Sequence, residues 1–241
     1  MKVHVWAENR PLPLAVDVMK RLYPQGIEGA ISAFLSKDEG LEPSSSTSFD
    51  EDYGLSDAML QKTDVLVYWS HKHWREVPED RVEALYNAVL NGMGLVLLHS
   101  AHASKIFSKL LGTRTQSLLW HEDDEKQTVW NVNPAHPIAC GIPQSFAIPQ
   151  DESYGEYFEI PQPDEQIFLT VSESKDVLRS GICYYRGRGK IFYFSAGHET
   201  YPVYYQKEIE KIILNAVHWA CGSRDTKWPL WAREKMEEQT K

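Results

Sequence analysis

Short apolar runs alternate with helical patterns through the first 100 residues. Four of these runs are brief and almost continuously apolar, as in strands covered on both faces of a parallel sheet. They are residues 3–7, 27–35, 65–69 and 95–98. Between them, Leu14, Val18 and Leu22 share one helix face, and an apolar stripe predicts a second helix over residues 79–90. The alternation predicts an α/β fold, with a mostly parallel sheet and helices on both faces.

Shorter strands are predicted in the second half of the chain. They occupy residues 115–135, 153–159 and 166–172, and a hairpin joins 182–186 to 191–195. A strong apolar stripe predicts a helix over residues 208–220. Since no repeat or linker is visible, we expect residues 1–241 to form a single α/β domain with a C-terminal tail from about residue 222. The polar stretch 36–57 is predicted to be a loop, and whether it covers a pocket stays open.

The composition is typical of a globular protein. Of the 241 residues, 42% are hydrophobic and 24% are charged, and the net charge is −9. This charge argues against a nucleic-acid partner or an anionic membrane surface, and no apolar stretch is long enough to span a membrane. The first ten residues do not resemble a signal peptide, and the three cysteines show no CxxC spacing. We therefore expect a cytoplasmic protein with reduced thiols.

Histidines follow three of the predicted strands. His71, His99 and His198 each stand at or shortly after a strand end, and ligands of parallel sheets bind beyond the carboxyl ends of the strands. Three imidazoles with an open fourth position form the ligand set of a catalytic zinc ion, although imidazole also binds other divalent transition metals. The sequence predicts a divalent metal site here, with zinc favoured. Hydrogen bonding of these rings to loop carbonyls or to a sugar is the alternative.

The remaining histidines have structural interpretations. In His71-Lys72-His73 only one ring is expected to point inward, and we favour His71. His121 lies in an acidic run, which indicates a solvated loop. His4, His136 and His218 are expected to serve the core, its edge or a turn.

Carboxylates and a serine offer further chemistry. Glu152 and Glu156 stand beside tyrosines, where carboxylates bind sugar hydroxyls or act as a base, although an exposed turn is an equal alternative. Arg179 is expected to hold an anion or ring oxygens. Ser100 follows a strand as in a nucleophile elbow, but the flanking glycines of the Gly-x-Ser-x-Gly pattern are missing.

Several of these segments resemble the ThuA-like (trehalose utilisation) family, which is similar to the class I glutamine amidotransferase-like superfamily. The resemblance is carried by residues 69–71, 92–102, 133–138, 141–142, 152–156, 179–181, 186–194 and 197–202. It implies a flavodoxin-like sheet with the site at its carboxyl edge. It also implies that His99 stands at the position of the amidotransferases' cysteine nucleophile and His198-Glu199 near their catalytic His-x-Glu, so glutaminase activity is not expected. Relatives tend to carry a histidine near Trp74 and an arginine at the position of His121.

These observations lead to the hypothesis of a metal-assisted enzyme of sugar catabolism that acts on 3-keto disaccharides or glycosides. A metal held by His71, His99 and His198 would stabilise an enolate oxygen. The predicted catalytic residues are His198, Glu199 and Glu152, with Glu152 or His198 as the base that removes the C2 proton. If His198 binds the metal, it cannot also be the free base.

A small-molecule sugar is the predicted partner. The residues expected to bind it are His102, Tyr154, Glu156 and Arg179. The rival hypothesis is a metal-free sugar-binding or regulatory protein on an amidotransferase-like scaffold. We also expect a homo-oligomer, because residues 228–231 form an apolar cluster with two tryptophans.

Overall fold

The computed structural model describes residues 1–221 as nine strands and six α-helices joined by turns and short 3₁₀ segments. The strands are β1 (Lys2–Ala7), β2 (Glu42–Thr47), β3 (Val65–Ser70), β4 (Gly94–His99), β5 (Leu119–Asn131), β6 (Ser145–Gly155), β7 (Glu165–Ser172), β8 (Val177–Arg186) and β9 (Gly189–Phe194). The helices are α1 (Val16–Leu22), α2 (Gly26–Leu35), α3 (Asp57–Lys62), α4 (Glu79–Leu90), α5 (Lys105–Leu111) and α6 (Lys207–Ala220). The predicted tail and the apolar cluster at 228–231 lie outside the described residues.

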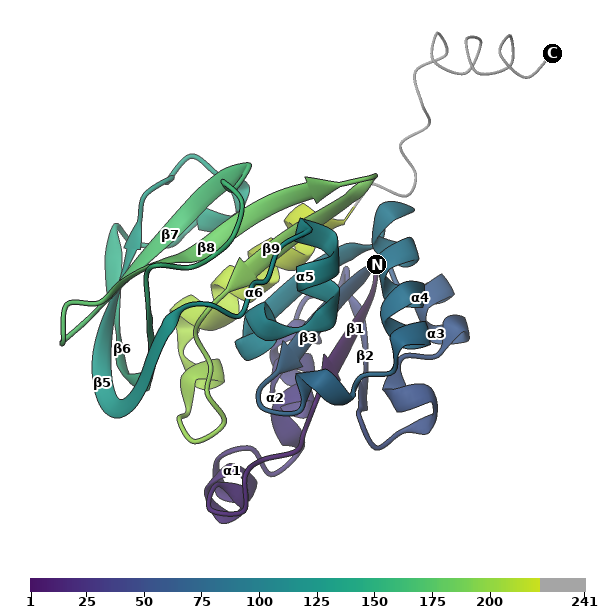
Figure 1. Ribbon diagram of the computed structural model, residues 1–241, viewed down its shortest axis with the longest axis horizontal. Helices are drawn as coiled ribbons and strands as arrows, with labels where there is room; N and C mark the ends of the chain where they lie inside the picture. Colours follow the sequence, from purple (N-terminus) through teal and green to yellow (C-terminus); the bar gives the residue numbers. More distant parts are fainter. Residues whose placement is uncertain (222–241) are drawn as a thin grey trace, which may run out of the picture.

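All nine of these strands belong to one sheet with two different halves (Figure 1). Its order is β2-β1-β3-β4-β9-β8-β7-β5-β6. Neighbours from β2 to β9 pair in parallel, and neighbours from β9 to β6 pair antiparallel. Strand β9 therefore joins a parallel half to an antiparallel half, and the predicted α/β fold class is confirmed.

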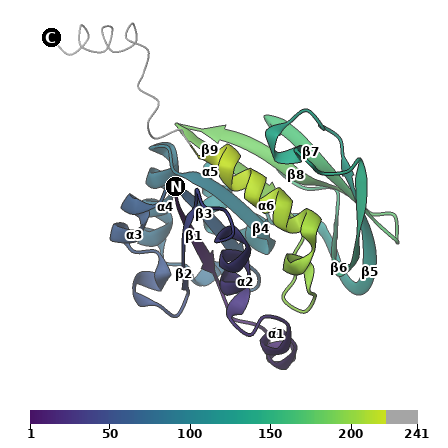
Figure 2. The same ribbon diagram turned by 180° about the vertical axis from the view of Figure 1, so that it is seen from behind.

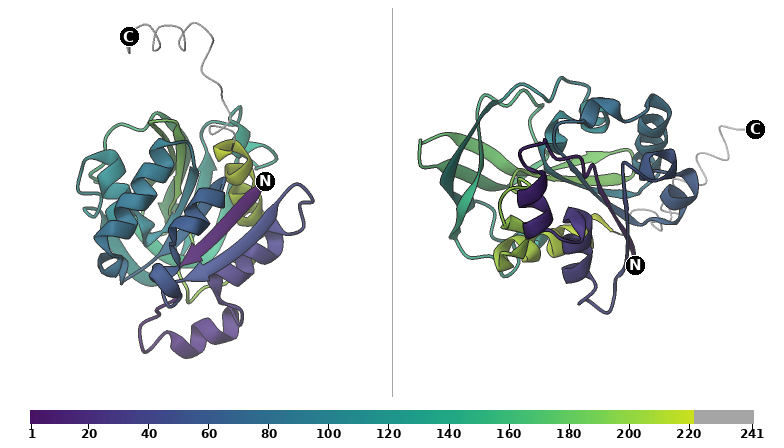
Figure 3. Two further views of the ribbon diagram at one scale, coloured as in Figure 1. Left: turned by 90° about the vertical axis from the view of Figure 1, so that its right-hand side faces the viewer. Right: turned by 90° about the horizontal axis from the view of Figure 1, so that it is seen from below.

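Helices cover both faces of the parallel half. Helices α2 and α6 contribute to one apolar cluster, and α3, α4 and α5 contribute to the other. Figure 2, the view from behind, shows α2 and α6 together on the face turned towards the viewer, and the side view in Figure 3 shows the sheet between the two helical layers. Because both faces are covered, strands β3 and β4 are buried along their whole length. Within residues 1–221 no helix is long and apolar enough to cross a lipid bilayer.

Two elements differ from the sequence-based expectation. Residues 27–35 were predicted as a strand but lie in α2, because the buried side chains Ile27, Ile31, Phe34 and Leu35 follow the helical repeat. The neighbouring strand is instead β2, inside the segment predicted as a loop. Its polar sequence fits an edge position, where only β1 pairs with it and much of it meets water.

One predicted strand boundary and one predicted helix face also differ from the structure. The predicted strand at 153–159 is the end of the longer strand β6, which begins at Ser145. Helix α1 buries Met19 against the core, whereas Leu14 precedes the helix and is almost fully exposed. Of the predicted stripe of Leu14, Val18 and Leu22, Leu22 packs partly against the core, but Leu14 does not belong to the buried face. The predicted helices at 79–90 and 208–220 correspond to α4 and α6.

Candidate functional site

Three neighbouring strands of the parallel half bring three histidines together. His71 follows β3, His99 ends β4 and His198 follows β9, and these strands are adjacent in the sheet. The ring centroids are 4.6 Å apart for His71 and His198, and 5.3 Å apart for each of the other two pairs. All three side chains are buried. The rings therefore share one small volume at the carboxyl edge of the sheet.

The donor atoms around this volume suit a cation. His71, His99, His198 and Glu199 each offer a ligand atom, and these atoms lie within 4.8 Å of one another. Three buried atoms of the cluster have no hydrogen-bond partner within the described part of the chain, namely Nε2 of His71, Nε2 of His198 and Oε2 of Glu199. Leaving buried polar atoms unsatisfied is costly. The set of imidazole nitrogens and one carboxylate oxygen fits zinc or another divalent transition metal.

The ring orientations follow from contacts on the outer side of the cluster. Nδ1 of His71 lies 2.8 Å from Oε1 of Glu199, and Nδ1 of His198 lies 2.7 Å from Oγ1 of Thr200. In both rings Nε2 therefore faces the shared volume, as in metal sites whose histidines are fixed through their second nitrogen. His99 has a positive φ of 57°, which is uncommon for a residue with a side chain. This backbone turns the chain from β4 directly into the next short helix.

Two buried carboxylates that sequence reasoning missed hold the histidine turns. Glu8, directly after β1, accepts hydrogen bonds from Oγ of Ser70 at 2.6 Å and from the backbone N–H groups of His71, Lys72 and His73 at 2.8–3.0 Å. Asp151 in β6 accepts from the N–H groups of Gly197 at 2.8 Å and His198 at 3.0 Å. A charged residue directly after a buried strand was the available signal for Glu8.

The turn before His198 requires a glycine at position 197. Its φ of +125° disfavours any side chain, and a Cβ atom there would collide with the hydroxyl of Tyr204. The turn that Asp151 holds therefore needs both a glycine and a buried carboxylate.

Burial keeps two imidazoles of the cluster, those of His99 and His198, neutral. Burial lowers the pKa of His198 to about 4 and the pKa of His99 well below its usual value, with the neighbouring rings adding to the effect at His99. Burial alone would raise the pKa of Glu199, but the hydrogen bond with His71 and the nearby imidazoles outweigh this effect, and the pKa is lowered. Neutral imidazole and ionised carboxylate are the forms that bind metal ions.

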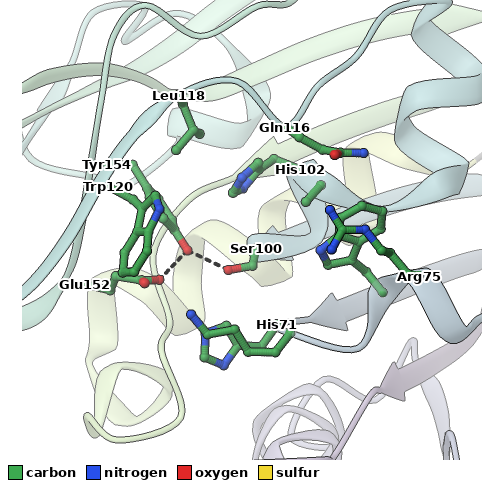
Figure 4. Close-up of a pocket in the computed structure, with 12 residues that line it drawn as sticks. His71, Arg75, Ser100, His102, Gln116, Leu118, Trp120, Glu152 and Tyr154 are labelled. Atoms are coloured by element: carbon green, nitrogen blue, oxygen red, sulfur yellow. Dashed lines mark hydrogen bonds between the residues drawn. The ribbon is translucent and has the colours of Figure 1, made fainter. Parts of the chain in front are cut away.

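A pocket of about 390 Å³ opens above the cluster (Figure 4). It is lined by His71 and, among others, Ser100, His102, Trp120, Glu152 and Tyr154. The hydroxyl of Tyr154 donates to Oε2 of Glu152 and lies 2.6 Å from Oγ of Ser100. Burial raises the pKa of Glu152. Its Oε2 lies 3.4 Å from Nε2 of His99, so one carboxylate joins the pocket to the histidine cluster.

Some predicted site residues lie elsewhere. Glu156 and Arg179 form an ion pair with each other, with two N–O distances of 2.9 Å, and neither lines the pocket. No residue of 36–57 lines it either. The hydroxyl of Ser100 contacts Tyr154, and within residues 1–221 it makes no hydrogen bond to an imidazole that would serve as its base. His102 and Tyr154 do line the pocket.

The other histidines have local partners. His73 contacts Glu76, His121 contacts Asp123 and Asp176, His4 contacts Ser44 and Ser46, and His218 contacts Asp38. His136 accepts from the N–H of Ile138 in a turn.

The structure thus combines an α/β sheet, a polar pocket at the carboxyl edge of its parallel half, and a histidine at the end of β4. The profile of the family described as Trehalose utilisation (ThuA) matches residues 2–220, and the chain belongs to this family. Among curated proteins none matches it.

Solved structures with the same fold are distant in sequence. A protein described as ThuA-like from Parabacteroides merdae is 13% identical, with a TM-score of 0.63 over 95% of this chain and 92% of its own. A second, from Bacteroides uniformis, is 18% identical, with a TM-score of 0.62 over 91% of each chain. A protein from Thermoplasma acidophilum, described as part of a GMP synthase, is 13% identical, with a TM-score of 0.56 over 100% of this chain and 98% of its own. These likenesses show the fold.

Proposed function

We propose that this protein is a metal-dependent, cytoplasmic enzyme of sugar catabolism that acts on 3-keto disaccharides or glycosides. The observation that carries the proposal is the buried cluster of His71, His99, His198 and Glu199 beneath a pocket that contains Glu152. The cluster has three buried imidazoles, of which burial keeps those of His99 and His198 neutral, together with unpartnered buried polar atoms and an adjacent carboxylate. Family membership supports a role in sugar utilisation.

The residues of the site have two roles in this proposal, metal binding and proton removal. His71, His99 and His198 would hold the metal, and Glu199 fixes the ring of His71 through Nδ1. A divalent ion bound there, with zinc as first choice, would supply Lewis acidity towards a substrate oxygen. Because His198 belongs to the cluster, the base that the sequence left undecided is assigned to Glu152.

Glu152 has the features of a general base. It is buried, it lines the pocket, and burial raises its pKa, which makes its carboxylate a stronger proton acceptor. A ketone at C3 acidifies the hydrogen on C2. Glu152 takes that proton, the electrons of the C2–H bond form a double bond between C1 and C2, and the C1–O bond breaks. The departing oxygen takes up a proton, so the net reaction is an elimination without an oxidant or reductant.

Metal content tests the proposal most directly. The full-length protein, loaded with zinc or manganese and then dialysed, is expected to retain about one equivalent by elemental analysis. His99→Ala is expected to lose the metal and at least a hundredfold in turnover of 3-keto-trehalose. His218→Ala, which changes an exposed histidine of α6, serves as the matched control.

Two outcomes would reject the enzyme. A metal content below about a tenth of an equivalent, unchanged by added zinc or manganese, would favour the metal-free sugar-binding protein. Turnover that survives in His99→Ala would remove His99 from the mechanism.

A further inference from the structure

Two tryptophans of the pocket are not used by the proposed chemistry. Trp120, near the start of β5, lines the pocket and is 55% exposed. Trp74 lines it from the turn after β3 and is half-buried. Aromatic side chains are typical of ligand pockets, because they offer a large, flat apolar surface with little flexibility. Two partly exposed indoles on one pocket therefore indicate a ligand surface.

A cation accompanies each indole. Nζ of Lys72 lies 4.7 Å from the ring centroid of Trp120, and Cζ of Arg75 lies 4.3 Å from that of Trp74. Such contacts hold a ring in place but cover only one of its faces. Both cations also line the pocket, together with the amide of Gln116. The walls thus combine flat apolar surfaces with several hydrogen-bond donors.

The pocket contains more surface than the proposed reaction uses. His71, a member of the histidine cluster, lines the pocket, and Glu152 lies against the cluster at His99. Figure 4 shows Trp120 beside Glu152 and Tyr154, with Arg75 on the other side of Ser100 and His71. The volume of about 390 Å³ falls within the range of roughly 300–1,000 Å³ that is usual for small-molecule sites. Surface for a ligand therefore continues beyond the atoms needed for the reaction itself.

We infer that Trp74 and Trp120 form an outer subsite for the second ring of a disaccharide, the ring that leaves. This inference rests on the proposed function, which places the reacting ring beside His71 and Glu152. The apolar C–H face of the outer pyranose packs on an indole, and its hydroxyls accept hydrogen bonds from Lys72, Arg75 and Gln116. The protein consequently prefers two-ring glycosides to monosaccharides.

Calorimetric titration of the metal-loaded, full-length protein with trehalose and with glucose tests the subsite. The wild type is expected to bind trehalose more tightly than glucose. Trp120→Ala is expected to weaken trehalose binding about tenfold, the loss expected for one aromatic contact, and to leave glucose binding unchanged. Trp120→Phe keeps a flat ring and is expected to retain most of the trehalose affinity.

Trp130→Ala is the matched control, because Trp130 lies on the same strand, is 43% exposed and does not line the pocket. It is expected to bind both sugars as the wild type does. Equal affinity of the wild type for the two sugars would overturn the inference, as would an equal loss for both sugars in Trp120→Ala. A protein without metal that keeps the trehalose preference would reject the proposed function and retain the subsite. A protein that turns over 3-keto-trehalose but binds trehalose and glucose equally well would support the proposed function and reject the subsite.

Discussion

The parallel and antiparallel halves of the sheet contribute to the site in different ways. In the parallel half, β3, β4 and β9 end at one edge, and the residues at their ends supply the histidine cluster. In the antiparallel half, the side chains come from along the strands. Glu152 and Tyr154 are two positions apart on β6, so their side chains point to the same face of the strand and both line the pocket. The parallel half thus builds the donor cluster, and the antiparallel half builds the wall and the proposed base.

The largest effect is expected for Glu152→Gln, which should abolish the contribution of the antiparallel half to turnover and leave metal binding by the parallel half unchanged. The amide keeps the shape of the side chain but cannot accept the C2 proton, so turnover of 3-keto-trehalose should fall about a thousandfold. Metal content should stay at the wild-type level, because Glu152 is not one of the proposed ligands. Steady-state kinetics and elemental analysis of the same preparation check both statements. Loss of metal together with activity would show that the halves are not separable in this way.

Glu8→Ala tests the parallel half alone. Removing the carboxylate leaves the donors of Ser70, His71, Lys72 and His73 without their acceptor, which should lower the free energy of unfolding by about 3 kcal/mol. Metal affinity should also fall, since the turn carries His71. Urea unfolding and a competitive chelator titration measure the two effects. Glu8→Gln retains one acceptor oxygen and should lose less of each, and an alanine variant as stable as the wild type would contradict the role of Glu8.

Asp151→Asn tests a place where the antiparallel half supports a histidine turn of the cluster. The carboxylate divides its two oxygens between the N–H groups of Gly197 and His198, whereas an amide has only one acceptor oxygen. Metal affinity should fall about 10- to 100-fold, as for other residues that orient a ligand, equivalent to about 1.4–2.7 kcal/mol. Chelator competition gives the number, with Asp123→Asn in the exposed acidic run as the control. Unchanged affinity would confine metal binding to the parallel half.

The same division explains what the sequence could predict. A histidine at the end of a buried parallel strand is placed by topology alone, so His71, His99 and His198 could be grouped without knowing any side-chain contact. Glu8 and Asp151 could not, because their role depends on which backbone N–H groups reach them in three dimensions. Glu156 and Arg179 were expected to bind sugar, but the sequence did not show that they pair with each other. The strand predicted at 27–35 is wrong because a short apolar run suits a buried helix equally well.

The smallest effect is expected at the polar edge of the parallel half. His4 on β1 contacts the hydroxyls of Ser44 and Ser46 on β2, and burial lowers its pKa to about 4, partly opposed by Asp50. The unfolded chain, with a pKa near 6.5, therefore binds this proton more readily than the folded protein does. Stability from neutral His4 is complete above pH 6.5 and is lost as the pH falls towards 4.

Urea unfolding at pH 7.5 and pH 5 should reveal this loss. The wild type should lose about 1–2 kcal/mol more than His4→Gln, whose amide keeps hydrogen-bonding groups near both serines but does not titrate. His218→Gln, at an exposed position, should follow the wild type. If His4→Gln loses as much stability as the wild type, the edge strand β2 is not held by a neutral imidazole. The polar contacts between β1 and β2 would then matter less than the apolar packing that covers the rest of the parallel half.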